Sequence, residues 1–313
     1  MRVGVLCSRV RLEEKQMFRA LREREVPFER IDVREIAFAL NGGGAEYTGH
    51  VSESAVCNAG YDVVLIRCLS HTRALYAARM LESQGVRTVN THRAIAICGD
   101  KVLTTMVLVK HGVPTPGTAI AFAQDTALAA MERMGYPVVV KPAVGSWGRL
   151  MAKLNGREAA EAVLEHKKAL GQADPCYIQA YIDKPGRDIR TLVVGDETVY
   201  AVYRHAPHWI TNTARGGETA PCPITPEIDQ ISRAAARAVG GEVVAVDLLE
   251  GENGALLVNE VNHTPEFHGA VKATTVDVAG RIVDYVLGVA GSGQQVVGES
   301  ARGSVLHKQS SRE

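Results

Sequence analysis

The segment from Gly241 to His268 constrains the fold of this chain more than any other stretch. Two runs of alternating residues predict two β-strands, and Asn253-Gly254 between them is typical of a two-residue hairpin turn. With that turn, Asp247 lies directly across from Glu260, and Asn262 follows on the same face. The apolar neighbours expected on this face, which indicate that it is buried, are Val243, Ala245, Leu256 and Val258. A longer loop, such as Gly251 to Gly254, would shift the register.

Two carboxylates that face each other on a sheet repel, unless a positive charge lies between them. Asp247, Glu260 and Asn262 offer only oxygen ligands, and such a set suits Mg²⁺, which leaves coordination positions open for phosphate. The alternative is a solvated hairpin with acidic residues facing water. The expected apolar neighbours favour the metal site.

The composition indicates a soluble globular protein of two to three domains. The chain has 313 residues, 46% of them hydrophobic, and a formal net charge of zero, which leaves room for a large core and argues against nucleic acid as the main partner. No apolar run approaches the ~18 residues that a membrane span needs, and the N-terminal run lacks a signal-peptide cleavage site. The six cysteines are scattered, so we expect reduced thiols and a cytoplasmic location.

Residues 1–95 alternate strand-like and helix-like segments, which predicts a parallel sheet covered on both faces. No GxGxxG follows the first strand, which argues against a dinucleotide-binding oxidoreductase. One helix over 91–111 is expected to carry Asp100-Lys101, and a mobile loop is expected over 41–58. We divide the chain into an N-terminal α/β domain (1–95), a central lobe (96–180), a C-terminal lobe (181–290) and a tail (291–313). The tail has little apolar surface to bury and is expected to be disordered.

A lysine at a strand end is followed by a glycine-bearing loop in the central lobe. The predicted strand 136–142 carries Lys141 near its end, and Ala143 to Arg149 form the loop. Free backbone N–H groups and a nearby cation can cradle a phosphate. The alternative is a plain hairpin turn beside an exposed lysine, with Trp147 either a lid residue or a lone exposed aromatic.

Four motifs together resemble those of ATP-grasp ligases: VVVKPAVGSWGR, YIQAYIDKPGRDIR, WITNTARGG and DLLEGENGALLVNEVNHTPEF. The similarity covers about residues 1–290 and points to the branch of the RimK-like ribosomal protein S6 glutamate ligase and the LysX/ArgX-type enzymes. The latter join an amino acid to the C-terminal glutamate of LysW, a small acidic amino-group carrier protein. The resemblance implies α/β and α+β architecture, with an N-terminal parallel-sheet pre-ATP-grasp domain followed by a two-lobed ATP-grasp fold.

The resemblance also implies positions for ATP, metal and substrate. Two lysines match residues that hold the ATP phosphates, a loop matches the lid over them, and the 179–182 strand matches the hinge at adenine. The implied ATP contacts are Lys101, Lys141, Gly145, Ser146, Trp147, Gly148, Arg149, Gln179, Ala180, Tyr181, Ile182, Asp188, Arg190, Arg204 and Asn212. Of these, Arg190, Arg204 and Asn212 are implied in catalysis, and Asp247, Glu260 and Asn262 match Mg²⁺ ligands, with two ions expected. For the substrates we expect contacts from Asn212, Arg215 and His208, with Trp209 beside the amine site. Arg190 or Arg215 would bind a substrate carboxylate through two parallel hydrogen bonds. The alternative for His208 and Trp209 is a surface-loop role.

The implied reaction activates a carboxylate as an acylphosphate at the expense of ATP, and an amine then attacks to form an amide. The expected substrates are the LysW-like carrier glutamate and 2-aminoadipate or glutamate, in lysine or arginine biosynthesis. Two alternatives stay open: a ligase that adds glutamate to a ribosomal or other protein tail, and an inactive nucleotide-binding regulator. The segment Pro265 to Gly269 departs from the LysX-type pattern, which leaves the amino acid open.

The resemblance further implies a homo-oligomer and an acidic carrier steered by local basic residues, with no nucleic-acid or membrane partner. The candidate basic residues follow early strands of the N-terminal domain: Arg9, Arg11, Arg67 and Arg73.

Overall fold

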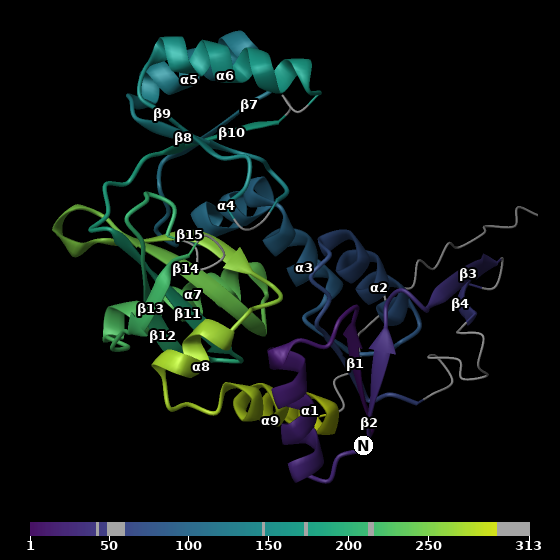
Figure 1. Ribbon diagram of the computed structural model, residues 1–313. Coiled ribbons are helices and arrows are strands. Elements are labelled where there is room, and N and C mark those ends of the chain that lie inside the picture. The colour runs from purple at the N-terminus through teal and green to yellow at the C-terminus, as the bar shows by residue number, and fades with distance from the viewer. Residues whose placement is uncertain (42–43, 49–59, 146–147, 172–174, 212–215, 293–313) are drawn as a thin grey trace, which may run out of the picture.

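The computed structural model describes residues 1–41, 44–48, 60–145, 148–171, 175–211 and 216–292. Figure 1 shows a small lobe at the top, a larger lobe below it, and an N-terminal domain beside the larger lobe. The predicted tail lies outside the described residues except for residues 291 and 292.

The N-terminal domain is built on a parallel sheet of order β2-β1-β5-β6, as predicted. Its strands are β1 (Val3–Cys7), β2 (Phe28–Asp32), β5 (Val63–Ile66) and β6 (Thr88–Val89). Helix α1 (Leu12–Glu23) packs on one face, and α2 (His71–Ser83) packs on the other. Strands β3 (Ala37–Asn41) and β4 (Gly44–Thr48) pair with each other, so part of the expected loop over 41–58 is a strand; its other residues lie outside the description.

The predicted single helix over 91–111 is wrong, because the chain breaks at Asp100 into α3 (His92–Gly99) and α4 (Lys101–Lys110). Asp100 is extended and caps α4, with its Oδ1 atom accepting from the N–H groups of Val102 and Leu103 at 2.8 and 3.2 Å. Its backbone forms an isolated bridge with Val144. The break therefore ties the start of α4 to the loop after Lys141.

The small lobe is an antiparallel sheet of order β7-β10-β8-β9. Its strands are β7 (Thr118–Ala121), β8 (Val138–Lys141), β9 (Ala152–Leu154) and β10 (Cys176–Ala180). Helices α5 (Gln124–Met134) and α6 (Arg157–Ala169) cover the face turned away from the large lobe (Figure 1). The other face of this sheet is turned toward the large lobe (Figure 1).

The large lobe is an antiparallel sheet of order β13-β12-β11-β14-β15. Its strands are β11 (Arg187–Val194), β12 (Glu197–His205), β13 (Glu218–Pro221), β14 (Val243–Glu250) and β15 (Leu256–Asn262). Helix α7 (Pro226–Val239) packs on one face, and side chains of α4 join the same core although we had placed α4 in the central lobe. The opposite face carries the polar site described below and, farther along the strands, a second core.

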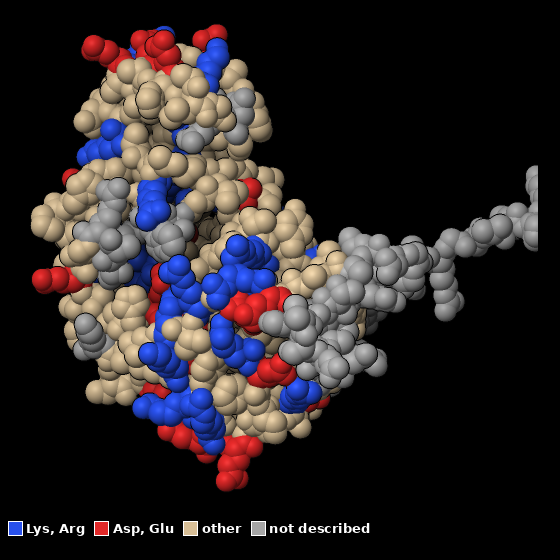
Figure 2. Space-filling view, turned by 45° about the vertical axis from the view of Figure 1, so that its right-hand side comes forward, with Lys and Arg blue, Asp and Glu red and all other residues tan. Residues whose placement is uncertain are grey.

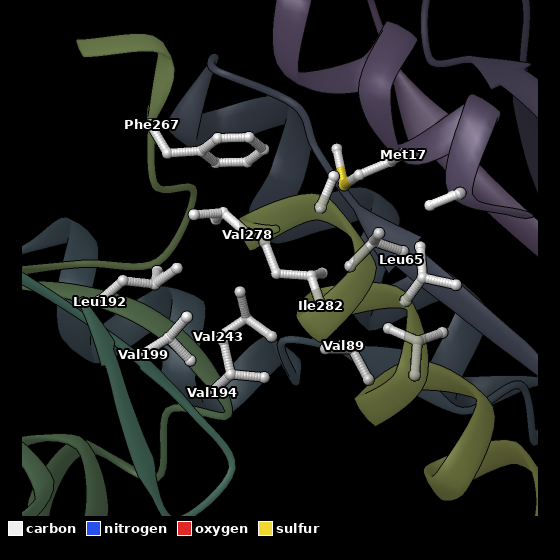
Figure 3. Close-up of a cluster of buried hydrophobic side chains, with 14 of the residues drawn as sticks. Met17, Leu65, Val89, Leu192, Val194, Val199, Val243, Phe267, Val278 and Ile282 are labelled. Carbon is white, nitrogen blue, oxygen red and sulfur yellow. The ribbon is translucent and has the colours of Figure 1, made fainter. Parts of the chain in front are cut away.

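That second core joins the large lobe to the N-terminal domain through the C-terminal helices, α8 (His268–Ala273) and α9 (Val278–Gly291). Figure 3 shows Ile282 of α9 between Leu65 of the N-terminal sheet and Val243 of β14. Buried Asn90 adds polar contacts, because its amide donates to the carbonyls of Val243 and His263 at 2.8 and 2.7 Å. The two parts are therefore packed as one body.

The hairpin places Asp247 across from Glu260, as predicted, but by a different route. The connection is a five-residue loop, 251–255, containing a short 3₁₀ helix, Glu252–Gly254, instead of a two-residue turn. A β-bulge then shifts the register between Asp247 and Leu248, so that Leu248 pairs with Val258. Val258 and Leu256 consequently pack on the α7 side, and the prediction that they share the face of Glu260 is wrong.

Candidate active site

A pocket lies between the two lobes at the end of β10. Its lining comes from both sheets and from the segments after β10 and β12. Figure 2 shows Lys and Arg side chains gathered around a hollow below the small lobe. The lining residues are Val139, Lys141, Met151, Gln179, Ala180, Tyr181, Ile182, Lys184, Asp188, Trp209, Ile210, Thr211, Leu249 and Asn259.

Lys141 ends β8 inside this pocket and is only 4% exposed. Its ammonium donates to Gln179 Oε1 at 2.6 Å and to Asn259 Oδ1 at 2.8 Å. Burial lowers the pKa of Lys141 to about 8, with the Glu260 carboxylate opposing that shift and the neighbouring Lys101 and Lys184 adding to it. Within the described residues the ammonium has two acceptors for its three N–H groups, and a buried cation with a donor to spare is suited to bind an anion.

Lys101 begins α4 and joins that helix to the loop after β8. Its Nζ donates to the carbonyl of Gly145 at 2.7 Å, and its backbone N–H donates to Ala143 O at 2.9 Å. The loop continues through left-handed residues, since Gly148 has a φ of 62° and Leu150 a φ of 56°. Ser146 and Trp147 lie outside the described residues, and Arg149 is exposed.

The strand β10 and the residues after it form one wall of the pocket. Gln179 is buried and opposes Val139 of β8, whereas Tyr181 and Ile182 follow the strand. Trp209 from the segment after β12 meets Tyr181 edge to face, with ring centroids 6.4 Å apart. Among the described residues, no backbone hydrogen bond is formed by the N–H of Ile182. An aromatic wall beside a free backbone donor can bind a flat heterocycle.

A row of paired charges crosses the large sheet below the pocket. The register puts Arg204 opposite Asp188, and Arg190 opposite Asp247, which opposes Glu260. The guanidinium of Arg204 donates to both oxygens of Asp188 at 2.6 and 2.9 Å, and that of Arg190 donates to both oxygens of Asp247 at 2.7 and 2.8 Å. Arg204 Nη2 also lies 3.1 Å from Asp247 Oδ2. The sheet therefore holds an alternating array of charges that is largely buried.

The arginines control the ionisation of Asp247. Burial alone would raise its pKa, but Arg190 and Arg204 reverse that effect and hold the pKa of this carboxyl well below its usual range. Asp247 in turn raises the pKa of Arg190 against the effect of burial. Asp247 is thus an anion at any neutral pH.

The sequences of known proteins identify the family. A RimK-like ATP-grasp domain model matches residues 98–286, and a LysX pre-ATP-grasp domain model matches residues 3–97. The glutamate–LysW ligase ArgX of Sulfolobus acidocaldarius is 35% identical over 290 residues, which cover 91% of this chain and 98% of that protein. The chain belongs to the RimK-like ATP-grasp ligases.

Other RimK-like ligases and solved ATP-grasp structures agree with that assignment. The α-aminoadipate–LysW ligase LysX of Saccharolobus solfataricus is 37% identical over 221 residues, 70% of this chain and 80% of that protein. The ribosomal protein bS6 glutamate ligase of Escherichia fergusonii is 36% identical over 214 residues, 67% of this chain and 70% of that protein. The RimK domain protein of Sphaerobacter thermophilus superposes with a TM-score of 0.73 at 24% identity, covering 92% of this chain and all of that one. The expected two-lobed ATP-grasp fold and the resemblance are therefore confirmed.

The expected metal ligands lie together on one face of the β14–β15 hairpin. Asp247 and Glu260 oppose each other, and Asn262 opposes Ala245 on the same face of the hairpin. The buried amide nitrogen of Asn262 has no hydrogen-bond partner in the described part of the chain. That part contains no group of three or more His, Cys, Asp or Glu side chains placed to hold a metal. Two carboxylates and the amide oxygen of Asn262 are the oxygen ligands that fit a hard cation sharing its shell with phosphate oxygens.

Three polar residues of the pocket were missed by sequence reasoning. Lys184 donates to Thr211 Oγ1 at 2.7 Å and lies 3.5 Å from Asp188 Oδ2, and burial lowers its pKa. Thr211 also donates to Asp188. Asn259 enters the pocket only because of the bulge. Lys184 stands in a quoted motif and could have been found, whereas no local signal marks a bulge.

The expected substrate residues are only partly described. Asn212 and Arg215 lie outside the described residues. His208 is exposed, with Nδ1 accepting from the N–H of Ile210 at 3.0 Å, and its ring lies 5.6 Å from that of Trp209. Trp209 itself lines the pocket with Lys141 and Tyr181.

The basic residues expected to steer a carrier fall into two groups. Arg67 is only 2% exposed and donates to Glu14 Oε1 at 3.1 Å and to Pro265 O at 2.9 Å. Arg11 is held by Glu14 and Glu266. Both residues fix the segment after the expected metal ligands, whereas Arg9 and Arg73 are exposed. The expectation that Arg67 forms part of a steering surface is wrong.

Proposed function

We propose that the chain is an ADP-forming ligase that joins the glutamate side-chain carboxylate at the C-terminus of a LysW-like carrier to the α-amino group of an amino acid. The supporting observation is the charge row of Arg204, Arg190, Asp247 and Glu260 beneath a pocket that holds Lys141. It supplies cations on one side and hard oxygen ligands on the other. Transfer of a γ-phosphoryl group to a carboxylate requires that arrangement, because it brings anions together.

The nucleotide is proposed to lie with its base between Tyr181, Ile182 and Trp209 and its phosphates toward Lys141 and Lys101. Backbone groups of the 179–182 segment would face adenine, and Lys184 and Asp188 would lie on the ribose and phosphate side. The Gly145 to Leu150 loop is joined to Lys101, so the lid and the lysine would move together. Gly148 and Arg149 belong to that lid, and the roles of Ser146, Trp147 and Asn212 stay predictions.

The metal site is proposed at Asp247, Glu260 and Asn262, with room for two Mg²⁺ ions. When bound, Mg²⁺ would neutralise charge on the transferring phosphoryl group. Arg190 holds Asp247 in place from below, and Arg204 bridges Asp188 and Asp247. These arginines keep the ligand carboxylate ionised and fixed before metal and nucleotide arrive.

Two substrates follow from this chemistry: a carboxylate that becomes an acylphosphate, and an amine that attacks it. The carrier and 2-aminoadipate or glutamate are proposed because relatives that are similar over most of the chain carry LysW-ligase names. Arg190 is largely committed to Asp247, which makes Arg215 the better candidate for a substrate carboxylate, with His208 beside the amine. Lysine and arginine biosynthesis are the pathways that these names suggest.

The protein is proposed to be a homo-oligomer located in the cytoplasm, with no nucleic-acid partner. Helix α4 offers an exposed apolar face in Leu103, Met106 and Val109. No helix within the described residues is long and apolar enough to cross a membrane. Light scattering of the purified protein tests the assembly, and a monomeric mass at micromolar concentration would exclude it.

Mass spectrometry of a candidate carrier tests the function directly. The protein, ATP and Mg²⁺ are incubated with an acidic LysW-like carrier and a pool of amino acids. The proposal predicts a carrier mass raised by one amino-acid residue, together with release of ADP. Addition to a ribosomal protein tail instead of the carrier would identify the glutamate-ligase alternative, and nucleotide binding without turnover would identify the regulator.

A further inference from the structure

The bulge in β15 brings one extra side chain onto the face that carries the proposed ATP site. Asp247 pairs with Glu260, and the next pair is Leu248 with Val258, so Asn259 has no partner across the ladder. The side chain of Asn259 lines the pocket together with Leu249 of β14. A regular strand would have turned position 259 toward the α7 core.

Asn259 crosses from the large lobe to the small lobe to bind a single group. Its Oδ1 atom accepts from the ammonium of Lys141 at 2.8 Å, and Gln179 Oε1 accepts from the same ammonium at 2.6 Å. An ammonium has three N–H donors in tetrahedral directions. With two of them held by amide oxygens, the third has a fixed direction.

The second acceptor is itself held by a chain of hydrogen bonds. Gln179 Nε2 donates to Tyr177 Oη at 3.2 Å, and that hydroxyl lies 2.8 Å from Thr105 Oγ1 on α4. Because Nε2 is engaged in this way, the oxygen of the Gln179 amide is the atom that faces Lys141. Lys141 is therefore oriented by Gln179 within the small lobe, and Asn259 adds a second contact from the large lobe.

We propose that Asn259 is a positioning residue, which fixes the Lys141 ammonium so that its remaining N–H points at the terminal phosphates of the nucleotide. This inference rests on the proposed function, because it assumes that Lys141 binds those phosphates. A lysine side chain loses rotamer entropy when it is held in one geometry. Because the two amide acceptors already hold Lys141 in the folded protein, nucleotide binding does not have to order it.

The charged groups that face Lys141 predict how its binding depends on pH. Glu260 and Asp247 favour its protonated form, while burial and the positive charges of Lys101 and Lys184 oppose it, giving a pKa of about 8. Protonated Lys141 attracts phosphate, so binding of a triphosphate weakens as the pH rises above about 8. An acceptor at position 259 stabilises the ammonium and so raises the pKa of Lys141. Without that acceptor, triphosphate binding should weaken at a lower pH.

Equilibrium binding separates this role from simple space filling. Two ligands are titrated into the protein by calorimetry across pH 6.5 to 9.5: an ATP analogue that cannot transfer its γ-phosphate, and adenosine. The variants are Asn259→Leu, which keeps the size and removes the acceptor, and Asn259→Asp, which keeps the acceptor and adds negative charge. Asn155→Leu, at an exposed position between β9 and α6, is the matched control.

In Asn259→Leu we expect the affinity for the triphosphate analogue to fall about tenfold, the loss expected for a hydrogen bond to a charged group. Adenosine affinity stays unchanged, because the aromatic wall is intact. The pH midpoint, at which triphosphate affinity has fallen halfway, moves down. In Asn259→Asp the midpoint moves up. The Asn155→Leu control binds both ligands as the parent protein does.

Unchanged triphosphate affinity and pH midpoint in Asn259→Leu would overturn the inference. If that variant fails to fold, Asn259→Asp decides, since a midpoint that does not move upward also overturns it. Failure of the parent protein to bind the triphosphate at all would instead reject the proposed function.

Discussion

Asp247 is a buried carboxylate that contacts two arginines at the centre of this site. A carboxylate that two arginines grip in the interior contributes stability only while the whole group is intact. Its opposition to Glu260 could be predicted from the hairpin pattern, whereas the grip of Arg190 and Arg204 could not, because it depends on register across β11 and β12.

The substitution Asp247→Asn removes one buried charge and leaves two arginines without their shared partner. We expect the free energy of unfolding to fall by about 3–5 kcal/mol, the usual cost of breaking a buried ion pair. Urea denaturation at pH 7 measures it. Glu161→Gln, which breaks an exposed pair with Arg157, serves as the control and should change little. Equal effects of the two substitutions would contradict the buried network.

The pH dependence of the same variant has a defined sign. The arginines lower the pKa of folded Asp247 below its ordinary value of 3.8, so its contribution is present above about pH 4 and lost as the pH falls further. The difference in stability between the parent protein and Asp247→Asn should therefore narrow between pH 4 and pH 2.5. A difference that stays constant over this range would show that Asp247 is not held as an anion by Arg190 and Arg204.

At the scale of elements, three local irregularities shape the site: a loop, a bulge and a helix break. A loop longer than the predicted turn and a bulge at Asn259 offset each other, which preserves the pairing of Asp247 with Glu260. The break at Asp100 starts α4 at Lys101. Periodicity identified the N-terminal parallel sheet and the β14 and β15 strands, because burial sets it. It did not identify β4, which falls in the expected loop, and bulges and breaks depend on tertiary contacts.

The break between α3 and α4 can be tested at Gly99. A Cβ atom there would lie 1.8 Å from the ring of His71. We expect Gly99→Ala to lower the free energy of unfolding by about 1–3 kcal/mol through this overpacking. His71→Ala should recover much of that loss in the double variant, and thermal unfolding of all four proteins measures the coupling. Additive effects would place the strain elsewhere.

At the scale of the whole molecule, α9 joins the N-terminal domain to the large lobe. Ile282 is fully buried in a core shared by both. That shared core, unlike either sheet alone, could not be predicted from the sequence, because residues that meet in it, such as Leu65 and Ile282, are more than 200 residues apart in the chain.

The substitution Ile282→Ala leaves a cavity in this shared core and should cost about 2–5 kcal/mol. Because both parts lose packing, we expect the parent protein and the variant each to unfold them in one calorimetric transition, at a lower temperature in the variant. Val276→Ala, which is partly exposed and precedes α9, is the control. Separate transitions for the two parts in the parent protein would contradict the shared core.

The facing carboxylates of the β14–β15 hairpin are proposed to bind a divalent cation together with the nucleotide phosphates. Calorimetric titration of ADP with and without Mg²⁺, into the parent protein and into Glu260→Gln, tests this most directly. We expect Mg²⁺ to tighten ADP binding to the parent protein at least tenfold and to have little effect on ADP binding to Glu260→Gln. An equal gain from Mg²⁺ in both proteins would contradict it.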